Sequence, residues 1–541
     1  MRCVARRGIA SARATASTPS RAVTRIALAA APAGRPAQRC GLHCTHAQRS
    51  DAAPVAAAAN SSSGVAAAAP AAAECASASS SAAPIYTVSE LIRALQSRSI
   101  QLPLPAPAPS ATDAAVAPSS SVPAAASPLV VRLRGWVRSA RASKLTCFLL
   151  LNDGTHLASV QCILDTAMLD ALPGGATSLA TGCSVDVTGK LVWTYKAEAA
   201  LQKLMAESAA AASSTPVDPL HHFASALALT CGTPMPQLPL IELQVSSLRI
   251  VGPCDPASYP IHSKQAQSLE HLREHLHLRT RTSTMAAVMR VRSRAQHAVH
   301  SFFQTEGFCN VHTPVLTPLD CEGAGEVFTA TTSSDKPPSQ LFFGRPMHLT
   351  VSGQLYAEML ACSLSKVYTF GPTFRAEQSN TTRHLNEFWM VEPELTHASL
   401  EQVMDLAERF VKQVVATILR DSEEDLCYFQ SRFDPALMST LRATCSSTPF
   451  VRITYAEALS LLRAAPKKAR FEFLPTWEGG LHSEHEKYLA DTHFKAPLFI
   501  TNYPRKAKPF YMRQEGTLEE QGKETVGGDR VQAQAVSGER L

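Results

Sequence analysis

Paired cysteines are the first feature that this 541-residue chain lacks. Its fourteen cysteines include no C-x-x-C pair, which excludes a zinc ribbon and a thioredoxin-like redox motif. Cys40, His43, Cys44 and His46 have the spacing of metal ligands, but they lie in an expected leader, without the folded frame that such a site needs. No metal site is therefore predicted, and the other cysteines are interpreted as reduced, mostly buried thiols.

Acidic residues are missing from the first fifty positions, which hold nine arginines among many alanines and serines. This composition, without a continuous apolar core, is typical of a transit peptide for a mitochondrion or a chloroplast. Taking the nine arginines away leaves 42 basic against 45 acidic residues, so the leader accounts for the formal net charge of +6. A nucleic acid would have to bind through local basic patches. A merely disordered tail is the alternative.

Long apolar runs are also missing, because no segment supplies the roughly 20 strongly apolar residues of a membrane-spanning helix. Residues 1–84 are interpreted as a transit peptide followed by a disordered, low-complexity leader. Residues 85–128 combine a short helix near Val88–Ser97 with a Pro/Ala/Ser linker that cannot bury enough apolar surface to fold. We expect a soluble protein of the matrix or stroma that contacts no membrane.

Short β-rich segments between residues 129 and 253 predict a small barrel. They are Val130–Val137, Cys147–Leu151, Ser159–Leu164, Ser184–Trp193 and Ile241–Val251. An alanine-rich insertion at 196–230 is expected on the surface. Helical periodicity in Thr282–Gly307 and Leu400–Leu419 predicts amphipathic helices of a second domain, residues 263–513. The fold class is therefore α+β.

Arginines, acids and aromatic residues are concentrated in one predicted hairpin, between Gly371 and Trp389. Two extended segments joined by a loop would bring Arg375 and Phe388 toward one site. A guanidinium can hold a phosphate through two parallel hydrogen bonds, and an aromatic ring can cover a purine. The hairpin therefore has the composition of a nucleotide pocket, although a surface hairpin with solvated charges has the same composition.

Seven blocks of sequence, in this order, resemble an asparaginyl-tRNA synthetase, a class II enzyme of the branch shared with the aspartyl and lysyl enzymes. They are Arg134–Arg138, Leu278–Arg281, Cys321–Phe328, Leu349–Leu355, Thr369–Glu377, Ser483–Glu486 and Asn502–Pro504. The resemblance implies an OB-fold anticodon-binding domain at 129–253 and a class II antiparallel sheet flanked by helices at 263–513. It also implies ATP-dependent ligation of asparagine to tRNA(Asn) through an asparaginyl-adenylate in an organelle, with ATP and Mg²⁺ as cofactors.

The resemblance also assigns site residues. Those for the tRNA anticodon are Arg138, Arg141, Phe148 and Gln161, although Phe148 could equally belong to the barrel core. Those for ATP are Arg375, Glu377, Arg383, His384 and Phe388, of which Arg375 and Arg383 are catalytic. Those for the amino acid are Glu322, Ser352, Gln354, Glu394 and Arg513. Pro314 ends the segment that forms the dimer interface in the family, so a homodimer is expected.

Position 357 favours asparagine over aspartate as the substrate. The aspartyl branch has a lysine there for the side-chain carboxylate, and this chain has Ala357. Without that cation, an aspartate carboxylate in the pocket would be a buried unpaired charge. An aspartyl-tRNA ligase nevertheless remains an alternative.

The resemblance ends at Arg513, and residues 514–541 are interpreted as a polar tail that does not match the family. The expected acidic strand and motif 3, with its arginine, are not recognisable there. We therefore expect an incomplete or aberrantly spliced product whose activity is uncertain. The other hypothesis is a noncatalytic tRNA-binding paralogue that keeps the barrel and the dimer helix.

Overall fold

The structure is a computed structural model, and it describes part of the chain. The described residues are 74–75, 83–97, 99, 102, 129–210, 237–262, 267–320, 327–331, 342–378, 385–466, 469–508, 511–513, 530–531 and 535–537. Residues 1–69, with the expected transit peptide, and the linker at 103–128 lie outside the described residues. Among the described helices, none is long and apolar enough to cross a membrane.

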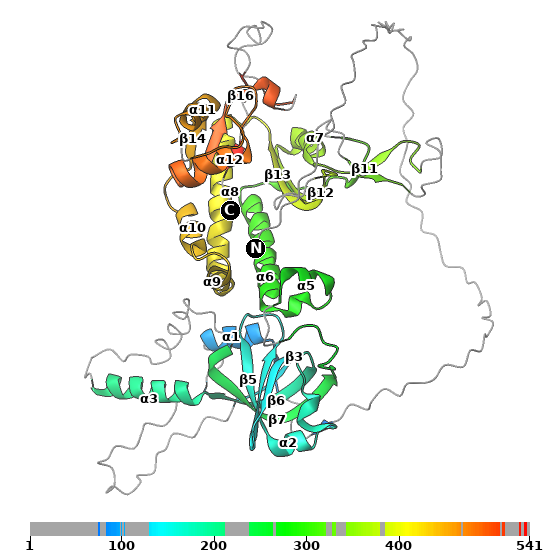
Figure 1. The fold of residues 1–541 in the computed structure, drawn as a ribbon, viewed down its shortest axis with the longest axis vertical. Helices are drawn as coiled ribbons and strands as arrows, with labels where there is room; N and C mark the ends of the chain where they lie inside the picture. Colours follow the sequence, from blue (N-terminus) through cyan, green and yellow to red (C-terminus); the bar gives the residue numbers. More distant parts are fainter. Residues whose placement is uncertain are drawn as a thin grey trace, which may run out of the picture. The chain divides into compact units, whose positions relative to one another are not determined.

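Five strands close into a barrel in the order β3-β4-β5-β7-β6 and back to β3 (Figure 1). They are β3 (Val130–Ala142), β4 (Thr146–Asn152), β5 (Ser159–Asp165), β6 (Ser184–Trp193) and β7 (Gln237–Gly252). Neighbouring strands are antiparallel, except that β5 and β7 are parallel. Two short strands, β1 (Glu74–Cys75) and β2 (Ile85–Tyr86), extend this sheet beside β7 and β3. The predicted barrel is confirmed.

Alternation of apolar side chains gives the barrel its core. In β4, Cys147, Leu149 and Leu151 are buried while Phe148 faces outward, as the two-residue period of a strand requires. Helix α1 (Val88–Gln96) begins at a capping box and adds apolar side chains to the same core. The shorter elements α2 (Thr166–Asp170) and η2 (Gly175–Ser178) lie between β5 and β6 in the chain.

The alanine-rich insertion begins with a helix, α3 (Tyr195–Ala210). Its first turns are not entirely a surface feature, because Ala197 and Leu201 are buried against Trp193 and Leu240. Alanine has the highest helix propensity, which explains why such a composition becomes helical once two side chains pack. Residues 211–236 of the insertion lie outside the described residues.

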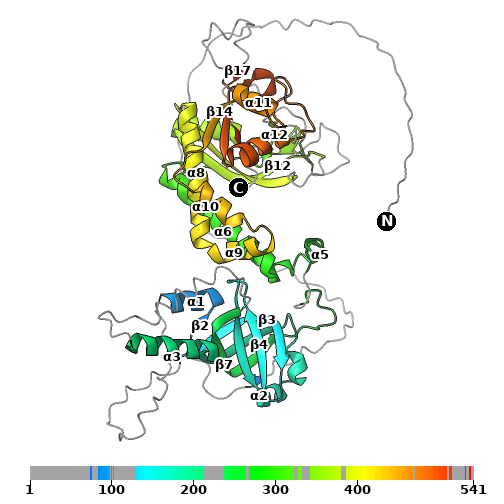
Figure 2. The ribbon, with the colours of Figure 1, turned by 60° about the vertical axis from the view of Figure 1, so that its left-hand side comes forward.

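The second half of the described chain mixes helices with small sheets (Figures 1 and 2). Its helical elements are α5 (Leu269–Glu274), η3 (Arg279–Arg281), α6 (Ser283–Thr305), α7 (Gln354–Leu364), α8 (Leu400–Asp421), α9 (Glu423–Arg432), α10 (Leu437–Thr444), α11 (Tyr455–Arg463), α12 (Ser483–Lys487), η5 (Tyr488–Phe494) and η6 (Arg505–Ala507). Its strands are β8 (Cys309–Asn310), β9 (Leu316–Thr317), β10 (Thr329–Ala330), β11 (Met347–Leu349), β12 (Lys366–Phe374), β13 (Glu387–Leu395), β14 (Val451–Thr454), β15 (Leu498–Thr501), β16 (Tyr503–Pro504), β17 (Arg530–Val531) and β18 (Ala535–Ser537).

Two long helices, α6 and α8, lie side by side and support the central hairpin of β12 and β13 (Figure 2). The Phe303 ring of α6 stacks on the Tyr368 ring of β12 at a centroid distance of 4.8 Å, and Phe410 of α8 lies 5.0 Å from Phe303. Both helices match the predicted periodic segments to within two residues at each end. Gly307 follows α6 with a φ of +80°, a conformation that glycine adopts without strain.

Two short strands come from the segment interpreted as a polar tail. The strand β18 pairs antiparallel with the buried strand β15, and β17 pairs with β16. Because β14 pairs parallel with the other edge of β15, β15 has hydrogen-bonding partners on both sides. Residues 535–537 thus complete a small three-stranded sheet.

Candidate active site

The hairpin of β12 and β13 forms the centre of the candidate site. Its strands pair from Lys366 opposite Leu395 to Phe374 opposite Glu387. Beyond the last pair, the Arg375 amide donates to the Asn386 carbonyl at 3.0 Å. The Asn386 side-chain amide donates in turn to the carbonyls of Arg375 and Glu377, at 2.8 and 3.2 Å. These bonds fix the backbone of Arg375 although the regular ladder has ended.

Arg375 and Phe388 lie together on this hairpin. The guanidinium carbon of Arg375 is 5.6 Å from the centroid of the Phe388 ring, within cation–π range. Glu377 also lies near this guanidinium, with its Oε1 4.0 Å from Nη1 of Arg375. The structure therefore brings together three of the five residues predicted for ATP. The other two, Arg383 and His384, lie outside the described residues.

Glu392 of β13 anchors the start of α7. The Ser352 hydroxyl donates to Glu392 Oε1 at 2.5 Å, and the Gly353 amide donates to both carboxylate oxygens at 3.1 Å. A Cβ atom on Gly353 would lie 2.5 Å from the Thr313 hydroxyl, so only glycine fits this close approach. The contact of the Ser352 hydroxyl is therefore with Glu392. The same hydroxyl oxygen accepts a hydrogen bond from the backbone amide of Gln354 at 3.1 Å.

Three carboxylates gather beside this anchor. Glu392 and Glu394 lie two residues apart on β13, and Gln354 donates to Glu358 on α7 at 2.8 Å. Burial first, and then Glu358 and Glu392, raise the pKa of Glu394 to about 8. A buried acid of this kind suits a ligand that brings an ammonium group or N–H donors. Sequence reasoning missed Glu358, although its spacing of four residues from Gln354 places both on one helix face.

A second group of predicted residues lies on the outer face of the barrel. Arg141 of β3 pairs with Phe148 of β4, and Phe148 is 38% exposed. Gln161 of β5 lies on the same face and donates to Glu242 at 3.3 Å. Phe148 is therefore not a core residue. A β-bulge interrupts the pairing of β3 with β4 at Arg138, and the Arg138 guanidinium donates to the Ser283 hydroxyl of α6 at 3.2 Å.

Comparison with known proteins agrees with both parts of this architecture. Residues 268–532 match the family described as class II tRNA synthetases (D, K and N), and residues 131–203 match an OB-fold nucleic acid binding domain. The asparagine–tRNA ligase of Microcystis aeruginosa is 43% identical over 387 residues, which cover 71% of this chain and 75% of that protein. That of Cytophaga hutchinsonii is 40% identical over 393 residues, covering 71% and 75%.

The chain belongs to the asparagine–tRNA ligases, which are class II aminoacyl-tRNA synthetases. A solved structure supports the fold of this ligase. Asparaginyl-tRNA synthetase from Pyrococcus horikoshii, complexed with asparaginyl-adenylate, superposes with a TM-score of 0.59 at 24% identity. The alignment covers 76% of this chain and 78% of that one. The predicted α+β architecture, an OB-fold barrel followed by a class II domain, is confirmed.

The remaining predicted residues of the ligase fall into separate places. Glu322 lies outside the described residues. Arg513 is exposed at the end of a described segment, and Pro314 is exposed beside Val315 and Leu316. The family match continues to residue 532, whereas the resemblance that we recognised in the sequence ends at Arg513. The pairing of β17 with β16 lies within this additional stretch.

Proposed function

We propose that this ligase joins ATP and asparagine at the β12–β13 hairpin and passes the activated asparagine to tRNA(Asn). The observation that supports this best is Arg375 over Phe388, on the face of β13 that also carries Glu392 and Glu394. In such a site the α-carboxylate of asparagine attacks the α-phosphorus of ATP in line, the bond from that phosphorus to the β-phosphate oxygen breaks, and pyrophosphate leaves as asparaginyl-adenylate forms. Catalysis then depends on alignment and on neutralising charge at the phosphoryl oxygens.

Each side chain has a distinct part in this proposal. Arg375 binds an α-phosphate oxygen, and the Phe388 ring supports adenine. Gln354 and Glu394 hold the amino acid, with Glu394 facing its N–H groups. Mg²⁺ bound with ATP would supply further positive charge to the phosphates.

Selection of asparagine follows from the surroundings of Ala357. This residue is fully buried in an apolar cluster with Ala361, Val367 and Val311. Position 357 therefore supplies no positively charged side chain to the pocket, and the side-chain carboxylate of a bound aspartate would have no ion-pair partner there. A site that depends on polar pairing can reject the wrong substrate by roughly 10⁴-fold.

The test is ATP–pyrophosphate exchange by the full chain with asparagine or aspartate. Exchange with asparagine alone supports the proposal. Exchange with aspartate would replace it with an aspartyl-tRNA ligase. Binding of tRNA(Asn) without any exchange would favour a noncatalytic tRNA-binding paralogue or a shortened inactive product, and a chain extended at its C-terminus from the transcript would then distinguish these two.

Ionisation of Glu394 is expected to control asparagine binding between pH 6 and 9. Because its pKa is raised to about 8, the carboxyl is mostly protonated at neutral pH and becomes a negatively charged acceptor for N–H groups as the pH rises through that value. The KM for asparagine should fall as pH rises through about 8. In Glu394→Gln, which cannot ionise, this step should disappear from the profile of exchange kinetics. An identical step in both proteins would contradict the assignment.

Phe148→Ala is expected to weaken tRNA(Asn) binding by roughly 5- to 150-fold, because base stacking on an aromatic ring contributes about 1–3 kcal/mol. Fluorescence anisotropy with a labelled transcript measures the effect. Tyr195→Ala removes a ring that is 85% exposed at the start of α3 and serves as the control. Equal affinities of the two variants would place the anticodon elsewhere.

We further propose that the ligase forms a homodimer and that it is located in a mitochondrion or chloroplast. Val315, Leu316 and Leu319 are 39%, 38% and 37% exposed beside Pro314, and a dimer would cover them. Sedimentation of the purified chain as a monomer at micromolar concentration would contradict the dimer.

The proposed location in an organelle is supported by the nine arginines, without any acidic residue, in residues 1–50. A fluorescent protein fused to residues 1–84 should be imported into the organelle, and its retention in the cytosol would contradict this location.

A further inference from the structure

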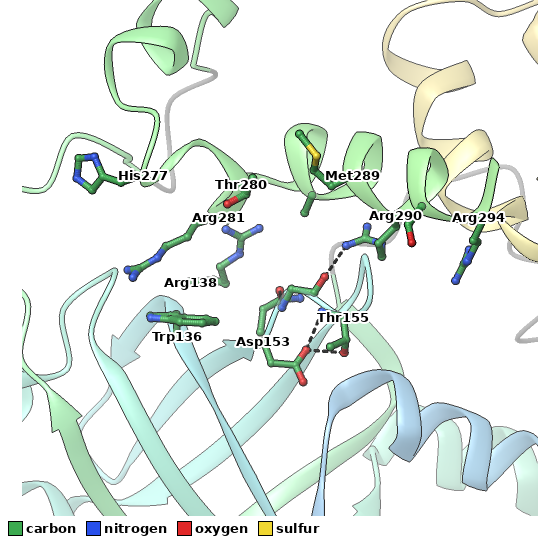
Figure 3. Close-up of a pocket in the computed structure, with 14 residues that line it drawn as sticks. Trp136, Arg138, Asp153, Thr155, His277, Thr280, Arg281, Met289, Arg290 and Arg294 are labelled. Atoms are coloured by element: carbon green, nitrogen blue, oxygen red, sulfur yellow. Dashed lines mark hydrogen bonds between the residues drawn. The ribbon is translucent and has the colours of Figure 1, made fainter. Parts of the chain in front are cut away.

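A cavity of about 640 Å³ lies away from the hairpin, where β3 and the turn after β4 meet η3 and α6 (Figure 3). Four arginines line it: Arg138, Arg281, Arg290 and Arg294. Asp153 is the one acid in its lining. The lining of the cavity therefore has an excess of positive charge, unless its arginines are paired with carboxylates outside the lining.

Two of the four arginines are paired within the protein. Arg290 donates to both carboxylate oxygens of Asp425, at 2.6 and 3.1 Å, and Arg294 lies 3.9 Å from the same carboxylate. Asp153 is engaged too: one of its oxygens accepts from the Val88 amide at 2.8 Å and the other accepts from Thr155. These neutral donors leave the charge of Asp153 in place, but among the described residues Asp153 makes no ion pair with Arg138 or Arg281.

Arg138 and Arg281 are the arginines that stay uncompensated. Among the residues that the structure describes, no carboxylate lies within 4.0 Å of either guanidinium; Arg138 donates to the Ser283 hydroxyl at 3.2 Å, and Arg281 lies 4.8 Å above the Trp136 ring. Figure 3 shows both side chains above Trp136, on the same side of the cavity. Burial lowers the pKa of Arg138, as expected for a cation that loses water without gaining a counter-ion.

We infer that Arg138 and Arg281 form a phosphate-binding site and that its occupant is a backbone phosphate of the bound tRNA. This inference rests on the proposed function. Two guanidinium groups in a concave, partly dehydrated site match the charge and the hydrogen-bonding capacity of a phosphodiester. The cation–π contact with Trp136 holds the Arg281 side chain in place before the ligand arrives.

The position of the cavity favours RNA over a free anion. Arg138 and Arg141 are three residues apart on β3, a separation of about 10 Å along a strand. Arg141 lies on the face with Phe148 and Gln161, where the anticodon is proposed to bind. A polynucleotide on that face therefore passes close to the cavity, and its backbone can place a phosphate there without a separate binding event. Free inorganic phosphate has the same chemistry and is the alternative source.

The test compares Arg138→Gln and Arg281→Gln with Arg292→Gln in the full chain. Arg292 is on α6, exposed and outside the cavity lining. Loss of one charge-assisted contact should weaken tRNA(Asn) binding roughly tenfold and lower the slope of log affinity against log salt by about one. Arg292→Gln should change neither quantity. Equal affinities and slopes in all three variants would overturn the inference.

Three further measurements separate the possible outcomes. Arg138→Lys keeps the charge and should recover most of the salt slope; if it fails to do so while melting at the wild-type temperature, the site is not an anion site. Calorimetric titration of inorganic phosphate into the unchanged chain tests the other source. If Arg138→Gln abolishes phosphate binding but leaves the affinity for tRNA(Asn) unaltered, the assignment to RNA is overturned. Exchange with asparagine in the unchanged chain tests the proposed function separately.

Discussion

Replacing Arg375 with alanine is expected to lower the rate of asparagine-dependent ATP–pyrophosphate exchange by roughly 10³-fold, the effect of removing an arginine that stabilises phosphoryl charge. The reason is geometric, because the guanidinium is held by a backbone that bonds to Asn386 and lies over Phe388. The loss should be mainly in kcat, since the charge develops in the transition state. Affinity for tRNA(Asn) should stay unchanged.

A matched control for Arg375 exists elsewhere in the same domain. Arg452 also lies over a phenylalanine, 5.9 Å from the centroid of the Phe499 ring, and it pairs with Asp405. Arg452→Ala removes the same groups without touching the hairpin and should retain exchange. Arg375→Lys should be intermediate, because an ammonium keeps the charge but cannot form two parallel bonds. Exchange by Arg375→Ala at the wild-type rate would refute the phosphate assignment.

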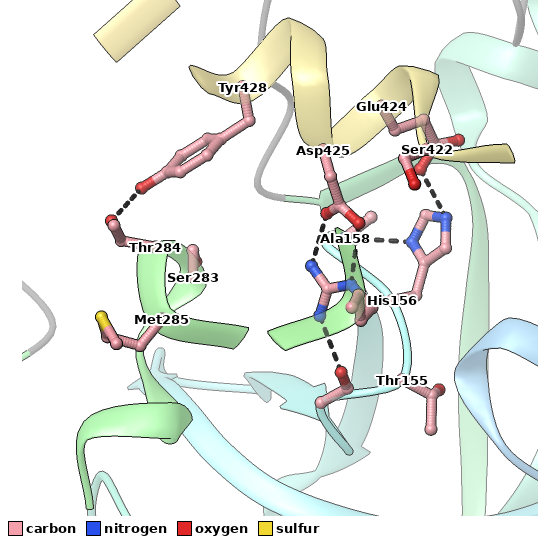
Figure 4. Close-up of polar contacts among 12 residues, drawn as sticks. Thr155, His156, Ala158, Ser283, Thr284, Met285, Ser422, Glu424, Asp425 and Tyr428 are labelled. Atoms are coloured by element: carbon pink, nitrogen blue, oxygen red, sulfur yellow. Dashed lines mark hydrogen bonds and ion pairs between the residues drawn. The ribbon is translucent and has the colours of Figure 1, made fainter. Parts of the chain in front are cut away.

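Asp425→Asn is expected to cost the folded protein about 3–5 kcal/mol, because it leaves a buried arginine without its partner. Asp425 is 4% exposed, and it accepts two hydrogen bonds from Arg290, whose side chain is 13% exposed (Figure 4). Urea unfolding followed by fluorescence measures the loss. The exposed pair of Arg420 and Asp421 is the control, and Asp421→Asn should change stability by less than about 1 kcal/mol.

A double variant tests whether this loss comes from the unpaired charge. Arg290→Met combined with Asp425→Leu removes both charges and keeps apolar volume, so it should be more stable than Asp425→Asn alone. If the double variant is as unstable as Asp425→Asn, the loss of stability comes from the missing ion pair and not from the unpaired guanidinium of Arg290. Thr284, which shares a 2.7 Å hydrogen bond with Tyr428 nearby (Figure 4), stays intact in both.

The barrel strands and the long helices could be predicted because their signals are local. The two-residue alternation in Cys147–Leu151 and the helical period in Leu400–Leu419 depend on neighbours within a few positions. Strand β6 was located to the residue, whereas β7 begins four residues before Ile241. The helix α3 was missed because its composition resembles a low-complexity insertion, and only its packing on Trp193 distinguishes the two.

The candidate site could be predicted in part. Arg375, Glu377 and Phe388 share one hairpin, so their proximity follows from strand pairing. The ion pair of Arg290 with Asp425 could not be found, because it joins residues 135 positions apart and no periodicity encodes such a distance. The bulge in β3 was also unpredictable, because the shift in pairing between Val137 and Ser139 has no signal in the alternation of the sequence.

One helix connects the two functional regions of the ligase. Near its start, Arg290 donates to the Gly154 carbonyl in a barrel turn at 2.7 Å, and ten residues later His300 shares a 2.8 Å hydrogen bond with the Tyr368 hydroxyl of β12. These anchors are about 15 Å apart on uninterrupted α-helix. Such a segment is stiff, so a shift of the barrel turn when tRNA docks would be carried to β12, the strand that ends one residue before Arg375, with no flexible joint to absorb it.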